Sequence, residues 1–204
     1  MLLGRPYHND PGINHEILEE FQKIGYPVLT PASLPIDEDI VWRLFGDDVR
    51  AGVIKDPMDI SDAWKNSYSE NTTQKVWAAK YTARHPNLVA LELSSFKCGH
   101  DAPIYTAVEE TVTKSGTPYF SFKDIDENKP TGSIKIRVEA ISYFLKRYRE
   151  DMVRHTQKQA EIDVKLREFE TRLRAEFDGA LPGPPPTPYE LETPVAINAI
   201  RREE

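Results

Sequence analysis

A chain of 204 residues provides for one domain of ordinary size plus an appendage, and its 39% hydrophobic and 29% charged residues are typical of a globular protein. Because 33 acidic side chains outnumber 26 basic ones, the formal net charge is −7, which argues against a general nucleic-acid-binding protein. No apolar stretch approaches the roughly 20 residues of a membrane span, and no basic segment leads into an apolar one as in a secretory signal.

The N-terminal segment predicts a β-α-β unit. Residues 1–4 predict a strand that Gly4 ends, and its abrupt start leads us to expect that the strand begins upstream and that the chain is a fragment of a longer polypeptide. Residues 13–24 place apolar side chains at helical spacing, and residues 26–30 predict a second, brief strand. Two strands joined by a helix favour parallel pairing with a right-handed crossover.

The next segment, residues 31–70, is irregular and contains short predicted helices at 38–45 and 59–65. An irregular stretch of this length is typically an insertion with a functional or docking role. A longer helix is then predicted up to Arg84, because Pro86 marks its end.

Residues 88–93 predict the central strand, since their apolar character is nearly continuous. Asp101 is expected to cap a helix that runs to Lys114, and residues 117–122 predict a further strand. A last helix is predicted to begin near Ser133.

Helical character continues through a charge-rich stretch with one apolar face, formed by Ile162, Leu166, Phe169, Leu173 and Phe177. Such a face needs another subunit or domain to cover it, so we expect an oligomer. The chain thus divides into an α/β domain at 1–150 with an insertion at 31–70, an amphipathic helical extension at 151–179, and a proline-rich tail at 180–204.

Four short strands alternating with helices predict the α/β class, with a small parallel sheet of flavodoxin or Rossmann type in three layers, a long C-terminal helix and a proline-rich tail. The strands would all end at the same edge of the sheet. Polar loops at 5–12, 94–101 and 123–132 follow three of these ends. Because ligands collect at the carboxyl edge of such sheets, we place a candidate site there.

The only cysteine, Cys98, lies in one of these loops, in the run Lys97-Cys98-Gly99-His100. One cysteine cannot form an internal disulfide, which fits a reducing cytoplasm. A thiol beside Lys97 and near a helix start suits metal ligation or nucleophilic chemistry, with His100 and Asp101 as candidate partners for the latter. No Cys or His has the paired spacing of a zinc site, and an inert thiol is the commonest outcome for a lone cysteine.

Arg5 and His8 follow the first strand and could hold a phosphate or a carboxylate near a helix start. The sequence there matches no Walker A or GxGxxG pattern, and the alternative is a turn capped by Asp10 or Asn14. In the third loop, Lys135 and Arg137 just inside the helix could attract an anion, although helix capping explains most of that segment.

Three segments taken together are similar to a known family: GRPYHNDPG (4–12), LELSSFKCGHD (91–101) and FSFKDIDENKPTGS (120–133). They resemble the carboxyl-terminal part of the large activase-like proteins related to 2-hydroxyacyl-CoA dehydratases and benzoyl-CoA reductases, the CoA-substrate-specific enzyme activase family. The similarity covers roughly residues 1–150 and does not extend to the tail.

The resemblance implies a cytoplasmic protein of anaerobic metabolism. Dehydratase-like domains of this family hold a [4Fe-4S]-type iron–sulfur cluster through cysteines from different α/β subdomains, and an ATP-hydrolysing activase supplies low-potential electrons. By that likeness Cys98 is one metal ligand, whose fellow ligands lie outside this chain, and Arg5, His8, Lys97 and His100 line the cofactor cleft. Implied partners are other subdomains or subunits and an acyl-CoA substrate, with neither nucleic acid nor membrane among them.

The chain departs from the family in lacking an ATPase motif and a second cysteine, so we do not expect it to be catalytic by itself. An alternative is a non-catalytic α/β module that docks partners through the helix at 150–178. A third interpretation is a small thiol-dependent enzyme with Cys98 as nucleophile.

Overall fold

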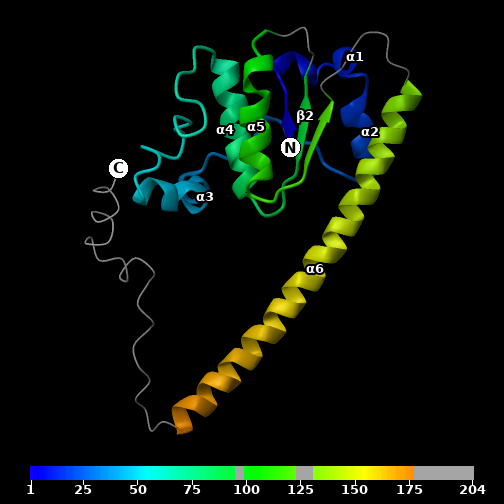
Figure 1. Ribbon diagram of the computed structural model, residues 1–204. Coiled ribbons are helices and arrows are strands. Elements are labelled where there is room, and N and C mark those ends of the chain that lie inside the picture. The colour runs from blue at the N-terminus through cyan, green and yellow to red at the C-terminus, as the bar shows by residue number, and fades with distance from the viewer. Residues whose placement is uncertain (95–98, 123–130, 177–204) are drawn as a thin grey trace, which may run out of the picture. The chain divides into compact units, whose positions relative to one another are not determined.

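A computed structural model of the chain describes residues 1–94, 99–122 and 131–176 (Figure 1). The chain divides into two compact units, residues 1–146 and residues 147–204, and the second is described as far as Glu176. The first unit is mixed α/β, which confirms the predicted class.

The described residues of the first unit form a sheet of three parallel strands: β1 (Leu2–Leu3), β2 (Ala90–Leu93) and β3 (Tyr119–Phe122). The order is β1-β2-β3, so β2 is the central strand, as predicted. In register, Leu91 of β2 is paired with Leu2 on one side and with Phe120 on the other.

The strand predicted over residues 26–30 is wrong, because these residues have no strand geometry. One backbone hydrogen bond, from the N–H of Leu2 to the carbonyl of Leu29 (2.7 Å), ties this segment to β1. Prolines at 27 and 31 have no N–H to donate, which limits how far a ladder could extend here.

Helices make up most of the remaining described structure. The α-helices are α1 (Pro11–Asn14), α2 (Ile17–Lys23), α3 (Glu38–Arg50), α4 (Glu70–Arg84), α5 (Tyr105–Thr113) and α6 (Thr131–Glu176). Short 3₁₀ turns are η1 (Pro6–Asn9), η2 (Pro31–Ser33) and η3 (Ala102–Ile104). In the predicted insertion, α3 extends beyond the expected 38–45, whereas 59–65 forms turns instead of a helix.

The helix predicted over 13–24 is broken in two, which corrects the sequence-based expectation. Between α1 and α2, His15 and Glu16 adopt left-handed backbone conformations, with φ of 54° and 58°. Asp10, one of the two residues predicted to cap this turn, does cap α1, because its Oδ1 accepts a hydrogen bond from the N–H of Gly12 at 2.8 Å. The break leaves Ile13 exposed, although its spacing had placed it on the buried face.

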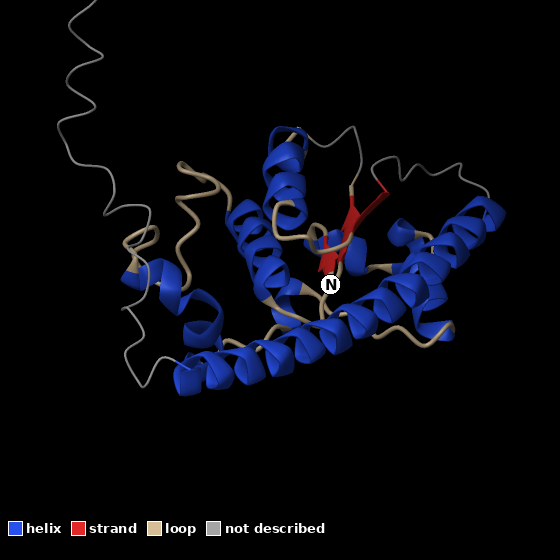
Figure 2. Cartoon of the chain, turned by 60° about the horizontal axis from the view of Figure 1, so that its bottom comes forward, coloured by secondary structure: helices blue, strands red, loops and turns tan. Residues whose placement is uncertain are grey.

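Helices lie on both faces of the sheet (Figure 1, Figure 2). Each face carries one of two hydrophobic clusters. Side chains of α3, α4 and α5 pack with Leu3 and Ala90, whereas α2 and the first part of α6 pack with Leu91, Leu93 and Phe122. Alternate residues of β2 therefore point to opposite faces, as in any strand. This alternation directs Glu92 and Ser94 toward the α4 and α5 side.

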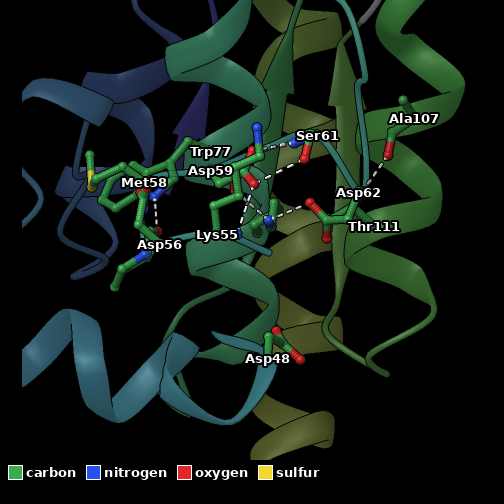
Figure 3. Close-up of polar contacts among 12 residues, drawn as sticks. Asp48, Lys55, Asp56, Met58, Asp59, Ser61, Asp62, Trp77, Ala107 and Thr111 are labelled. Atoms are coloured by element: carbon green, nitrogen blue, oxygen red, sulfur yellow. Dashed lines mark hydrogen bonds and ion pairs between the residues drawn. The ribbon is translucent and has the colours of Figure 1, made fainter. Parts of the chain in front are cut away.

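The loop of residues 55–62 is held against α4 by polar contacts (Figure 3). Asp59 accepts from the N–H groups of Lys55 and Ser61, and these bonds, the first above all, lower the pKa of its carboxyl to about 2. The buried ammonium of Lys80 contacts the Asp59 carbonyl at 2.7 Å and Asp62 at 2.6 Å. The indole of Trp77 donates to the Pro57 carbonyl.

The described part of the second unit is the continuation of helix α6 to Glu176. Its apolar side chains are largely exposed, among them Met152, Ile162, Leu166 and Phe169. None of the described helices combines the length and the apolar character that crossing a membrane requires. The predicted proline-rich tail at 180–204 lies outside the described residues.

Candidate functional site

A buried group of charged and polar side chains lies at the carboxyl edge of the sheet, where the sequence predicted a site. We call it the edge network; it consists of Arg5, Lys75, Glu92, Ser94, Asp101 and Tyr105. Four of these side chains, those of Lys75, Glu92, Ser94 and Asp101, are completely shielded from solvent. Burial of so many charges is costly unless they pair, so the arrangement is a specific one.

The elements of the sheet bring these residues together. Arg5 lies two residues after the end of β1, Glu92 lies within β2, and Ser94 follows β2. Lys75 is in the second turn of α4, whose side chains cover this face of the sheet. Asp101 precedes the 3₁₀ turn that leads into α5, where Tyr105 is the first residue.

Lys75 and Glu92 form the central ion pair of the network. Lys75 Nζ lies 2.7 Å from Glu92 Oε1 and 3.6 Å from Asp101 Oδ1. Neither contact has hydrogen-bond geometry, so the ammonium makes no hydrogen bond within the described part of the chain. The hydroxyl of Tyr119 donates to the other carboxylate oxygen of Glu92, and burial above all, together with that carboxylate, raises the pKa of this phenol.

Asp101 joins the loops that follow β1 and β2. Its Oδ1 accepts from Arg5 Nε at 2.7 Å, and its Oδ2 accepts from the Ser94 hydroxyl at 3.0 Å. Ser94 also shares a hydrogen bond with the Tyr105 hydroxyl, and a terminal nitrogen of Arg5 donates to Thr72 at 3.1 Å. Asp101 was expected to cap a helix, but its side chain makes no capping bond and serves this network instead.

His8 lies beside the network and is almost fully buried. Its Nδ1 accepts the N–H of Arg5 at 3.0 Å. Burial lowers the pKa of His8 to about 4, an effect that outweighs the opposing pull of Asp101. Gly4 makes this packing possible, because a Cβ at Gly4 would meet Nδ1 of His8 at 2.9 Å. The neutral ring therefore acts as a hydrogen-bond acceptor that fixes the loop after β1.

The structure brings some of the predicted site residues together and not others. Arg5 and His8 lie together. Arg5 binds a carboxylate, but this carboxylate is the side chain of Asp101 in the same chain and not that of a ligand. His100 is exposed. Lys97 and Cys98 lie outside the described residues; their segment, 95–98, connects Ser94 to Gly99.

Sequence reasoning did not identify Lys75, Glu92, Ser94 or Tyr105 as site residues. One signal was present: Glu92 is a carboxylate inside an otherwise apolar central strand, which requires a buried partner. The partner, Lys75, could not be deduced from the sequence. It lies in the separate helix α4, and the sequence does not show which residue of that helix faces Glu92 of β2.

The charges of the network balance within this chain, since two cations face two carboxylates. We find no group of three His, Cys, Asp or Glu side chains that could hold a metal ion across residues 1–94, 99–122 and 131–176. The network is therefore suited to positioning the loops that it joins, and in particular the two ends of segment 95–98.

Two hollows lie elsewhere in the first unit. One, of about 750 Å³, is lined by residues of α3, α4 and α5 and of the 62–64 segment, with Arg84, Trp64 and Glu110 among them. Asp62 and Thr111, which are labelled in Figure 3, are among its lining residues. The other, of about 150 Å³, is mainly apolar and includes Phe21 and Phe120. Neither includes a residue that the sequence predicted for the site.

No family model, curated protein or solved structure matches this chain.

Proposed function

We propose that this chain is an α/β subdomain of an iron–sulfur 2-hydroxyacyl-CoA dehydratase- or activase-like protein. In this role Cys98 contributes one ligand of a [4Fe-4S]-type cluster that serves ATP-driven low-potential electron transfer. A cluster of this type is held by thiolates, and the chain has one cysteine, so the other ligands come from sequence outside it.

The observation that carries the proposal is the contact between Arg5 and Asp101, at 2.7 Å. It joins the loops after β1 and β2, and the segment that holds Cys98 lies between Ser94 and Asp101, which are themselves hydrogen-bonded. Metal ligands are normally held in place by a surrounding set of hydrogen bonds. Anchoring both ends of a ligand-bearing loop on a buried network is what such a role requires.

The arrangement of the sheet supports a flavodoxin-like fold in three layers, which is part of the proposal. Residues 26–30 lie beside β1 through the Leu2–Leu29 hydrogen bond, on the side away from β2. The segment is not a strand, but it occupies the place beside β1 that the second strand takes in the order 2-1-3-4 of flavodoxin-like sheets. Ligands in such sheets bind where the order reverses, between the ends of β1 and β2, where Arg5 meets Asp101.

The test is the iron and acid-labile sulfide content of the anaerobically prepared assembly that contains this chain and the polypeptide with the remaining cysteines. Cys98→Ala is expected to lower both contents and to alter the electron paramagnetic resonance spectrum of the reduced cluster. Lys114→Met, a substitution of an exposed side chain outside the predicted site, serves as the control for handling. Cluster content unchanged in Cys98→Ala would exclude Cys98 as a ligand.

A second candidate function is an assembly module, which the exposed apolar side chains of residues 147–176 favour. Deleting residues 150–204 should then reduce the mass of the native protein to that of one chain while the first unit stays folded. An unchanged state of association after this deletion would exclude the assembly role.

A further inference from the structure

We propose that residues 152–173 of α6 pair with the same residues of a second copy of this chain, in register, as a parallel two-stranded coiled coil. This inference names the partner for the assembly role and is independent of the iron–sulfur cluster. It begins from the exposed side chains of Met152, Ile162, Leu166 and Phe169, which share one helix.

Most of the exposed apolar residues in this segment follow a heptad pattern, whereas Val153 and Val164 lie outside it. With Met152 at position a, the core positions in chain order are Met152, His155, Gln159, Ile162, Leu166, Phe169 and Leu173. The four core positions from Ile162 to Leu173 are all apolar and lie four, three and four residues apart, which is the spacing of a coiled-coil seam, and Met152 lies ten residues before Ile162. This stretch of helix is about 33 Å long, at 1.5 Å per residue.

The charges beside this seam identify the partner and its direction. Position g carries Lys158, Lys165 and Arg172, and position e carries Asp163 and Glu170. In a parallel pair, g contacts the e position of the next heptad of the partner, so Lys158 meets Asp163 and Lys165 meets Glu170. In an antiparallel pair, g meets g and e meets e, which would bring like charges together. A second copy in parallel orientation is therefore the complementary partner.

Contacts within the helix leave room for these pairs. Asp163 accepts from Gln159 at 2.8 Å, and Glu170 accepts from Arg174 at 2.8 Å. Both are exposed contacts four residues apart along the helix, and such contacts contribute little to stability. A carboxylate has two oxygens and several acceptor sites, so a lysine from a second helix can join without displacing the first partner.

The polar residues in the seam set the register. Gln159 occupies an a position and His155 a d position, between Met152 and the apolar C-terminal part of the seam. A buried polar residue at one of these positions favours the alignment in which it meets its own counterpart, because any shift would place it opposite an apolar side chain. The in-register parallel pair satisfies this requirement for both residues.

The first test compares two sets of acidic substitutions by sedimentation equilibrium of the full chain at about 100 μM, where a coiled coil of this size should associate. The wild type and Val164→Asp, whose side chain is exposed on the outer face, are expected to be dimers. Leu166→Asp with Phe169→Asp is expected to be monomeric. A monomeric wild type, or a dimer that survives the seam substitutions, would overturn the proposal.

Charge exchange tests the pairing between e and g positions. Lys158→Glu with Lys165→Glu turns four attractive contacts per dimer into repulsive ones and should raise the dissociation constant at least about tenfold. Adding Asp163→Lys and Glu170→Lys to the same chain restores opposite charges in a parallel pair and should recover the dimer. Circular dichroism checks that helix content is equal in all variants. Failure of this recovery would reject the parallel pairing.

Cysteine cross-linking tests the register. In a Cys98→Ser background, Leu173→Cys places thiols opposite each other in the parallel pair, and oxidation should join the two chains. Arg167→Cys, at an outer position of the same helix, is the matched control and should stay unlinked. Equal cross-linking of both variants would contradict the register. A chain that assembles but fails these two tests keeps the assembly role and loses this inference.

Discussion

Lys75 Nζ lies 2.7 Å from Glu92 Oε1, and both side chains are completely shielded from water. The pair joins helix α4 to the central strand, two residues before Ser94. A hydrophobic pair would stabilise the fold at lower cost, because two buried ions lose their hydration. Retaining these charges in the core therefore costs stability, which is consistent with the proposed role of the network in positioning the loops.

Replacing Lys75 by methionine should destabilise the first unit by about 3–5 kcal/mol, because it leaves two carboxylates with one cation, Arg5, in a buried region. Chemical denaturation measures this change. The matched control is Lys114→Met, since the Lys114–Glu110 pair is exposed and should change stability by less than about 1 kcal/mol.

Adding Glu92→Gln to Lys75→Met should recover part of the lost stability. The two remaining charged groups, Arg5 and Asp101, then balance, and the amide can still accept the hydroxyl of Tyr119. If the double variant loses as much free energy of unfolding as the two single variants lose in sum, the two side chains do not interact and the ion pair is not what holds them there.

Much of the sheet was predictable, because its signals are local. The apolar run before Ser94 identified the central strand, and alternating strands and helices identified parallel pairing. The segment 26–30 was predicted as a strand on the same grounds. It is not one, since its prolines limit the ladder that apolar character alone would suggest.

The site was predictable only in part. The rule that ligands collect at the carboxyl edge of a parallel sheet selected Arg5 and His8, and both lie at the network. The rule does not say which helix supplies the counter-charges, so Lys75 was missed. It also does not separate a side chain that joins the network from one that faces solvent, as His100 does.

The break between α1 and α2 gives a prediction about backbone strain. Glu16 is exposed with φ of 58°, a conformation that costs a residue with a Cβ about 1 kcal/mol and glycine almost nothing. Glu16→Gly should therefore keep or raise the melting temperature, whereas substitution of most exposed residues by glycine lowers it. Glu16→Ala keeps the strain and should leave the melting temperature unchanged. A marked loss of stability in the glycine variant would show that the left-handed conformation is not retained in solution.

His8 should make the stability of the fold dependent on pH. Its pKa is about 4 in the folded chain, against an ordinary value of 6.5, because burial disfavours the charged ring. Between these values the unfolded chain binds a proton that the folded chain does not, so stability falls as the pH decreases from 6.5 to 4. The expected loss from this residue is about 3 kcal/mol, which denaturation at a series of pH values measures.

The comparison with His8→Asn isolates this effect from the titration of carboxylates. An asparagine can still accept the N–H of Arg5 but has no proton to gain in this range, so the variant should lose about 3 kcal/mol less than the wild type between pH 7 and pH 4. His100→Asn, on an exposed side chain, should follow the wild type. If His8→Asn and the wild type lose stability in parallel, His8 is protonated as readily in the folded chain as in the unfolded one. In that case its ring would not be the neutral acceptor that fixes Arg5 toward Asp101.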